Sequence, residues 1–85
     1  MIICLFTSGH HSEKPAYIAS GQSKDEAIKN VIDWYRDRME NSDFDEEQVE
    51  LLNQECAEMQ SELENEGQAS IAHEGTYHLI EMPTH

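Results

Sequence analysis

The chain has 85 residues, of which 18 are acidic and five are Lys or Arg, so its formal net charge at pH 7 is −13. A surface of this charge repels nucleic acid and anionic membranes and attracts basic proteins, which argues against direct binding of DNA, RNA or a membrane. The length suits one small domain, 1–85, with a single modest core, and a homodimer would add buried area to it.

Acidic and basic residues are distributed unevenly along the chain. Residues 1–38 hold all five basic residues and five acids, whereas residues 39–85 hold 13 acids and no basic residue. The longest apolar run, Ile2 to Phe6, has five residues and lacks the flanking features of a signal peptide, so we expect a cytoplasmic protein. Cys4 and Cys56 both fall on apolar faces, where we expect free buried thiols, although a disulfide stays open.

The first part of the chain predicts two strands. The run from Met1 to Thr7 is short, β-branched and apolar on both faces, which is typical of an inner strand. A polar loop from Ser8 to Lys14 follows it. Beyond Pro15, the stretch Ala16 to Ala19 predicts a second strand that forms a hairpin with the first.

Ser23 and Glu26 have the spacing of a capping box, in which a serine side chain accepts from a free backbone N–H and a glutamate returns the bond. We therefore expect a helix that begins at Ser23 and ends near Glu40. Its apolar residues recur every three or four positions, which predicts one buried stripe. The stripe comprises Ile28, Val31, Ile32, Tyr35 and Met39, with Ala27 and Trp34 on its flank.

The stretch from Asp45 to Glu66 is the most unusual part of the sequence. Nine of its 22 residues are carboxylates, and none is Lys or Arg. A narrow apolar stripe nevertheless repeats through it at helical spacing, which predicts an amphipathic helix packed on the rest of the protein. This stripe comprises Val49, Leu52, Cys56, Met59 and Leu63. We expect Asp43 with Glu46 to cap the start of the helix and Gly67 to end it.

The last part of the chain predicts a second hairpin. Ala69 to His73 and Thr76 to Met82 have the pattern of strands on either side of Glu74-Gly75, a two-residue turn. The expected fold is therefore α+β in the order ββααββ, with a four-stranded, mainly antiparallel sheet and two antiparallel helices packed on one face.

Two resemblances carry functional expectations. The run AYIASGQSKDEAIKNV, which ends at Val31, resembles the strand, G-x-S-x-x-E-A motif and helix start of HicB-type antitoxins, acidic proteins that neutralise a small basic RNA-cleaving toxin. It covers about a fifth of the chain, which departs from that family by a second long helix, and no site residue is carried over. The acidic stretch resembles, in charge pattern only, the DNA-mimic proteins with which phages and mobile elements occupy the nucleic-acid groove of restriction or CRISPR effectors.

A candidate site follows from the acidic stretch. If its apolar stripe faces the protein, a rotation of about 100° per residue turns several carboxylates and one leucine to the opposite face. These candidate partner-binding residues are Glu47, Glu50, Leu51, Glu58 and Glu62. One interpretation is a solvated face with a single exposed leucine, which is common. The other is a carboxylate ridge around an apolar anchor, since i,i+4 repulsion costs about 0.2–0.5 kcal/mol per pair and solubility alone does not require it.

Four histidines invite a metal-binding interpretation. In a hairpin of the last two strands, His73 and His78 would share one sheet face, and His10 and His11 could add ligands from the first loop. No Cys-x-x-Cys or His-x-x-x-His spacing supports such a site, and three separate segments would have to converge. We therefore expect no metal and no cofactor.

The sequence also specifies no catalytic residues. A thiol nucleophile needs an electropositive, accessible setting, whereas Cys4 and Cys56 lie on apolar faces of an acidic chain. Carboxylates are abundant, but no pair is singled out as a general acid and base. We therefore expect a binding protein and not an enzyme.

These observations favour an acidic inhibitor that mimics nucleic acid and binds the basic nucleic-acid-binding surface of a protein target. We expect such an inhibitor to be an anti-defence protein of a phage or mobile element, either anti-restriction or anti-CRISPR. Two alternatives stay open: a HicB-like antitoxin that neutralises a small basic toxin, and a plain interaction or dimerisation module whose charge serves solubility.

Overall fold

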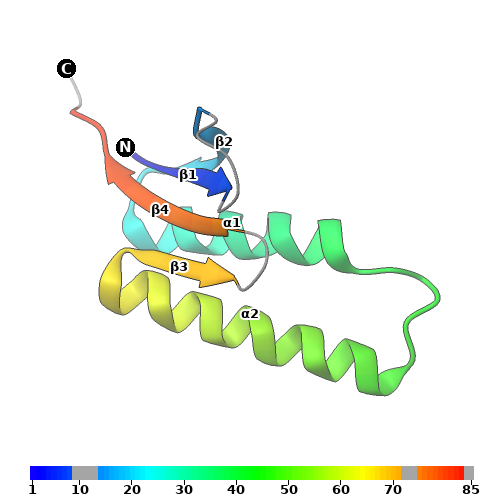
Figure 1. Cartoon of the computed structure of the whole chain (residues 1–85). Coiled ribbons are helices and arrows are strands. Elements are labelled where there is room, and N and C mark those ends of the chain that lie inside the picture. Colours follow the sequence, from blue (N-terminus) through cyan, green and yellow to red (C-terminus); the bar gives the residue numbers. More distant parts are fainter. Residues whose placement is uncertain (9–13, 72–74, 84–85) are drawn as a thin grey trace.

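The first and last strands of the chain lie side by side in the middle of one sheet (Figure 1). The computed structural model describes residues 1–8, 14–71 and 75–83. In chain order the elements are β1 (Ile2–Ser8), β2 (Ala16–Gly21), α1 (Lys24–Met39), α2 (Glu46–Glu66), β3 (Gln68–Ile71) and β4 (Gly75–Glu81). Their spatial order is β2-β1-β4-β3, and every neighbouring pair is antiparallel. The predicted α+β class and the order ββααββ are confirmed.

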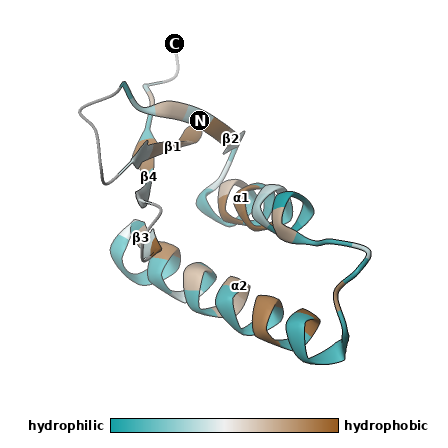
Figure 2. Ribbon diagram, turned by 45° about the vertical axis from the view of Figure 1, so that its right-hand side comes forward, coloured by the Kyte–Doolittle hydropathy of each residue, from teal (hydrophilic) through white to brown (hydrophobic). Residues whose placement is uncertain are grey.

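Both helices lie on the same side of the strands (Figure 2). They pack antiparallel to each other, α1 against β2 and β1 and α2 against β3. The turn between α1 and α2 lies furthest from the strands, so the hairpin of helices extends beyond the sheet and the molecule measures 46 × 29 × 22 Å (Figure 1). No helix in the described parts of the chain is long and apolar enough to cross a membrane.

The core lies between the sheet and the helices, and Tyr77 of β4 joins the two layers. Its ring lies 4.8 Å from that of Phe6 on β1, measured between centroids, and it meets the rings of Trp34 and Tyr35 on α1 edge-on at 6.3 and 6.2 Å. Such tilted and T-shaped contacts add to the stabilisation that aromatic burial provides. The sheet is thereby fixed to α1 through a cluster of four rings.

Both predicted helix stripes face this core. The buried members are Ile28, Val31, Ile32 and Tyr35 on α1 and Leu52, Cys56, Met59 and Leu63 on α2. Met39 and Val49, also predicted for the stripes, are only half-buried. Met39 ends α1 and Val49 belongs to the first turn of α2, so both lie in the part of the hairpin that the sheet does not cover.

Helix α1 begins at the predicted cap, although with one difference. The Ser23 hydroxyl accepts from the Glu26 N–H at 3.2 Å, but the Glu26 carboxylate accepts from the Gln22 N–H at 3.4 Å and not from Ser23. Ala27, expected on the flank of the stripe, is fully buried. It packs under the end of β2, where a Cβ at Gly21 would lie 2.9 Å from the Ala27 Cα. The glycine therefore permits a close approach of strand and helix.

Helix α2 is capped two residues later than predicted. Asp45 Oδ1 accepts from the Gln48 N–H at 2.9 Å, and Gln48 Oε1 accepts from the Asp45 N–H at 3.0 Å, which completes a capping box. The expected pair, Asp43 and Glu46, is wrong because Asp43 lies in the connecting turn and Glu46 is the first helical residue. Gly67 ends the helix in the left-handed conformation, with φ of 74°, as predicted.

The final hairpin differs from the prediction at its turn. Gly75 is the first residue of β4 and pairs with Ile71 of β3, so it does not belong to a two-residue turn with Glu74. A Cβ at Gly75 would clash with the Thr7 carbonyl oxygen and approach the Phe6 ring to 2.9 Å. The glycine thus serves the close contact with β1. His73 and Glu74, assigned to this strand and turn, lie outside the described residues.

Candidate functional site

The exposed surface of α2 is formed mainly by glutamates. All five candidate residues, Glu47, Glu50, Leu51, Glu58 and Glu62, are exposed. Glu46, Glu64 and Glu66 are exposed as well, and the helix contains no Lys or Arg. The carboxylates Glu46 and Glu47 lie at the positive end of the helix dipole, where they are favourable, but Glu64 and Glu66 lie at the negative end. The helix thus carries its charge without regard to its dipole.

Leu51 is exposed among the glutamates of α2 and also borders a groove. It is 57% exposed and lines a groove of about 400 Å³ together with Glu58 of α2 and Ser70 and Ile71 of β3. Of the candidate residues, only Leu51 and Glu58 line this groove. At about 100° per residue, Leu51 lies between Glu58 and Glu62 around the helix axis, roughly 60° from the direction opposite the apolar stripe. Leu51 thus belongs to the exposed surface of α2 and to the groove that α2 forms with β3.

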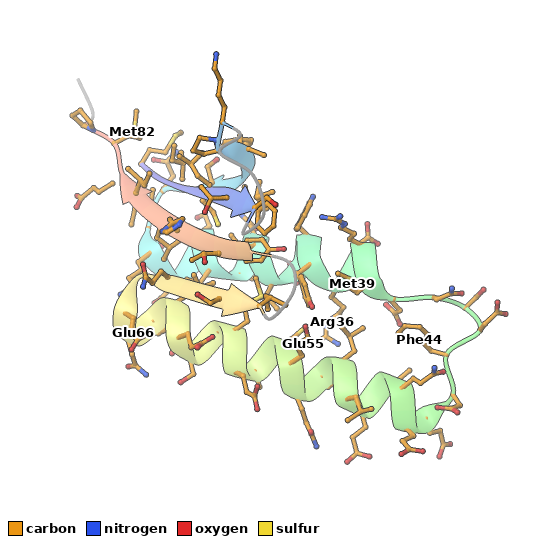
Figure 3. The ribbon with its side chains drawn as sticks, in the orientation of Figure 1. Arg36, Met39, Phe44, Glu55, Glu66 and Met82 are labelled. Carbon is orange, nitrogen blue, oxygen red and sulfur yellow. The ribbon has the colours of Figure 1, made fainter. Side chains whose placement is uncertain are left out.

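A second, more apolar groove also has Leu51 in its lining. It has a volume of about 240 Å³ and opens between the helices at the end that the sheet leaves uncovered (Figure 3). Its lining consists of Tyr35, Met39, Phe44, Gln48, Leu51, Leu52 and Glu55. We call this the distal groove. It places an exposed leucine next to half-buried Met39 and Phe44, within a strongly acidic part of the surface.

Phe44 is the member of the distal groove that sequence reasoning missed. It stands in the polar turn before α2, where it breaks the helical pattern. The signal that could have found it is its place directly before the Asp45 cap, since a hydrophobic residue there typically packs against the first turns of the helix. Because the sequence predicts the cap at Asp43, the role of Phe44 could not be recognised from it.

Basic side chains of α1 reach across to α2. Lys24 Nζ donates to the Glu64 backbone carbonyl at 2.6 Å, and Arg36 Nη1 donates to Asn53 Oδ1. Arg38 lies over the Trp34 ring, with 5.3 Å from its Cζ to the ring centroid. These cations therefore bind a carbonyl, an amide and a ring within the molecule. The candidate glutamates of α2 lie on a different side of that helix from Asn53, the residue that Arg36 contacts.

A third groove runs between the helices on the side of Lys29. It has a volume of about 360 Å³, and its lining consists of Asp25, Ile28, Lys29, Ile32, Asp33, Gln60 and Glu64. Its rim mixes three carboxylates with one ammonium group. No group of three or more His, Cys, Asp or Glu side chains suited to a metal ion is found within residues 1–8, 14–71 and 75–83.

Of the four histidines weighed for a metal site, the structure describes His78 alone. His10, His11 and His73 lie outside the described residues. His78 lies on β4, and its Nε2 is 3.2 Å from Thr7 Oγ1 on the neighbouring strand. The imidazole of His78 thus contacts a threonine hydroxyl.

The two cysteines are free and buried. Burial raises the pKa of the Cys4 thiol to about 11, against a smaller, opposite effect of a hydrogen bond with the His78 backbone. Burial is also the main reason why the pKa of Cys56 is raised, and the charges of Arg36 and Glu55 act on it in opposite directions. Because a thiolate is the reactive form, both environments suit inert core residues.

Comparison of the chain with known protein families, with curated proteins and with solved structures finds no match.

Proposed function

We propose that this protein is an acidic inhibitor that covers the basic nucleic-acid-binding surface of a protein target with helix α2. The observation that carries the proposal is the exposed surface of α2, which has seven exposed glutamates and no basic residue. At a rise of about 1.5 Å per residue the helix is roughly 32 Å long. Its seven exposed glutamates therefore follow each other every ~4.5 Å on average, of the same order as the ~3.4 Å between phosphates along one DNA strand.

The energetic cost of this pattern supports a role in binding. Glu46 and Glu50, and likewise Glu58 and Glu62, are like charges one helical turn apart, and each such pair destabilises a helix by about 0.2–0.5 kcal/mol. Lysines at alternate positions would form i,i+4 pairs with the glutamates and stabilise the helix instead. A surface that imitates a phosphate backbone needs the unbroken negative charge.

The shape of the molecule also supports it. The far end of the helix hairpin extends beyond the sheet, so α2 can enter a concave surface without collision of the strands (Figure 1). Leu51 and the distal groove add apolar contact area within the acid, and such central apolar contacts carry much of the binding energy of interfaces. Charge would then steer the encounter, and Leu51 would hold the complex.

The proposed setting is the cytoplasm, and the target class is a defence nuclease or its complex, such as a restriction or CRISPR effector. The free cysteines suit a reducing compartment. Buried thiols of raised pKa support a binding role over nucleophilic catalysis.

The test begins with the immobilised protein, incubated with host lysate and washed at salt concentrations from about 50 to about 500 mM, over which exposed charges become screened. A captured target is then purified, and its nucleic-acid binding is measured with and without this protein. We expect competition, and faster association with the wild type than with a Glu47→Lys, Glu58→Lys double variant, because rim charges steer encounter.

Two outcomes would count against the proposal. One is a target whose affinity is equal at both ends of the salt range, because a mainly electrostatic contact must weaken as charges are screened. The other is a target that binds nucleic acid and this protein at the same time. Recovery of one small basic toxin, and of no nucleic-acid-binding complex, would support the antitoxin function instead.

A further inference from the structure

The sheet has one face without a helix. Cys4, Phe6, Tyr77 and Leu79 of the central strands point to the helices and take part in the core. Because side chains alternate along a strand, the residues between them point to the opposite side, which we call the outer face. Among the described residues, both helices lie against the other side of the sheet (Figures 1 and 2).

The outer face gathers the exposed hydrophobic side chains of the protein. The apolar residues that alternation assigns to it are Met1, Ile3, Leu5, Tyr17, Ile80 and Met82. Ile3 pairs with Ile80, and the Met82 N–H donates to the Met1 carbonyl at 2.8 Å, which extends the same ladder by one step. Four of the five large exposed hydrophobic residues in the described parts of the chain belong to this face, and Leu51 is the fifth. The patch is therefore contiguous.

Among the described residues, the strand positions of the outer face include no Asp, Glu, Lys or Arg. Its other strand residues are serine, threonine, glutamine and the half-exposed His78, and Ser70 Oγ lies 3.1 Å from Thr76 Oγ1 across two strands. This is unexpected for a chain of net charge −13 with 18 acidic residues. Acidic residues cover α2 and the turn before it, whereas the described strand residues of the outer face include none. A basic partner would therefore find its attraction on α2, and none on the outer face.

We propose that the outer face docks on the same face of a second copy of this chain. Two copies repel each other wherever acid meets acid, and the neutral, apolar outer face is the surface on which they can meet without that cost. An identical patch on both partners is what a twofold dimer requires. The product is a two-layered β-sandwich with all four helices on the outside, which leaves both α2 surfaces accessible.

The edges of the sheet are less suited to the same purpose. β3 has four residues, and β2 contains a β-bulge because Ile18 is an extra residue between Tyr17 and Ala19, which pair with Leu5 and Cys4. Short edge strands and bulges both hinder the addition of a further strand. Association through the face of the sheet is thus favoured over association through its edges.

The size of the outer face limits the area that the dimer can bury. Four strands about 4.8 Å apart, with up to seven residues of about 3.4 Å each, span roughly 19 × 24 Å. Stable interfaces bury about 800 Å² on each partner, whereas this face covers about 460 Å², so the contact belongs to the weak, transient class. We expect a dissociation constant on the order of micromolar, and hence a monomer–dimer equilibrium in solution.

Sedimentation equilibrium of the full chain tests the proposal at about 50 and about 500 mM salt. We expect dimerisation to become tighter at high salt, because screening weakens the repulsion between two acidic copies. Target binding by α2 should respond in the opposite direction. Tyr17→Glu and Ile80→Glu each place a carboxylate on the outer face and should raise the dissociation constant on the order of tenfold or more. Leu51→Glu is the matched control, since it adds the same charge at a similarly exposed leucine on α2.

Circular dichroism establishes whether each variant is folded. If Ile80→Glu does not fold, Tyr17→Glu still tests the proposal, because Tyr17 is 62% exposed on an edge strand. A wild-type chain that stays monomeric at high salt and on the order of millimolar concentration would overturn the proposal. So would a dimer that tolerates both outer-face glutamates but dissociates with Leu51→Glu, since the contact would then lie on the helices.

Discussion

The phenol of Tyr35 on α1 donates a hydrogen bond to the carboxylate of Glu55 on α2. Tyr35 is 2% exposed, and its ring also meets that of Tyr77 on β4, so one side chain connects both helices and the sheet. Glu55 is the one glutamate of α2 that is half-buried and not exposed. It therefore belongs to the packing of the fold, whereas the other seven belong to the surface.

Removal of this hydroxyl should destabilise the protein. Tyr35→Phe keeps the buried ring but leaves the Glu55 carboxylate without this donor, which should lower the free energy of unfolding by about 1–2 kcal/mol. Tyr17→Phe is the control, since the Tyr17 hydroxyl donates to Ser20 Oγ at 2.9 Å on the exposed surface and should contribute less than about 0.5 kcal/mol. Urea unfolding measures both. Equal costs would show that the Tyr35–Glu55 bond does not stabilise the helix pair.

Gly21 and Gly67 should respond differently to alanine. At Gly21 a Cβ would lie 2.8 Å from the Glu26 carbonyl carbon and 2.9 Å from the Ala27 Cα. Both are backbone atoms that cannot move aside, so we expect the free energy of unfolding to fall by about 2–3 kcal/mol. At Gly67 nothing lies within 4 Å, and the cost is that of φ at 74°, about 1–2 kcal/mol. Urea unfolding of the two variants ranks them. A neutral Gly21→Ala would mean that β2 and α1 approach less closely than the structure shows.

Leu51 separates a binding surface from a merely solvated one. Leu51→Lys should change the free energy of unfolding by less than ~0.5 kcal/mol, because the side chain is 57% exposed and the new charge relieves repulsion. Its affinity for a captured target should fall by roughly 2 kcal/mol or more if Leu51 is the anchor. Ala57→Lys adds the same charge at an exposed position away from both grooves of Leu51, so calorimetry of the two variants separates loss of contact from change of charge. Equal losses would exclude an anchor at Leu51.

The raised pKa of Cys4 makes stability depend on pH in the alkaline range. The thiol ionises near 9.0 in the unfolded chain but at about 11 in the folded one, so the folded state favours the neutral form. The stabilisation that this difference gives the folded state is fully present below pH 9, declines between pH 9 and 11 and is lost above pH 11. Over this range the free energy of unfolding should fall by about 2–3 kcal/mol. In Cys4→Ala, urea unfolding should show a shallower decline over this range. Parallel curves for both proteins would assign the loss to other groups.

Zinc should leave the protein unaffected. A metal that binds only the folded state raises its melting temperature by mass action, and no group of three suitable ligands is found among the described residues. We therefore expect the same melting temperature with and without zinc in differential scanning calorimetry. A rise of several degrees that disappears in His78→Ala would show that His78 and histidines outside the described residues bind metal together.

Much of this fold is encoded over short distances in the sequence, and those parts could be predicted. The cap at Ser23, the stop at Gly67 and both apolar stripes depend on residues three or four positions apart. The inner position of β1 follows from its apolar character on both faces. In each case the physical cause lies within one turn of helix or one strand.

The remaining features depend on neighbours that are distant in the sequence. Asp43 and Asp45 are both good caps, and the choice between them follows from how the turn reaches α2. Gly75 looks like a turn residue, but the constraint comes from Thr7 on another strand. Leu51 can be assigned to the outer side of its helix, but the grooves beside it are completed by β3 and Phe44. No local pattern contains that information.

The strand order has a consequence for the way in which the chain folds. β4 is the last of the six elements to be synthesised, yet it lies between β1 and β3, which do not pair with each other. Ile2 must therefore meet Glu81 before the sheet is whole, whereas α1 and α2 can associate as soon as both exist. Contacts between such distant positions form slowly, because closure of a long loop costs entropy before any contact compensates for it. A nascent chain that ends before β4 holds the β1–β2 pair and the single segment of β3 without its partner strand, so the edge of β1 and the whole of β3 are exposed to aggregation.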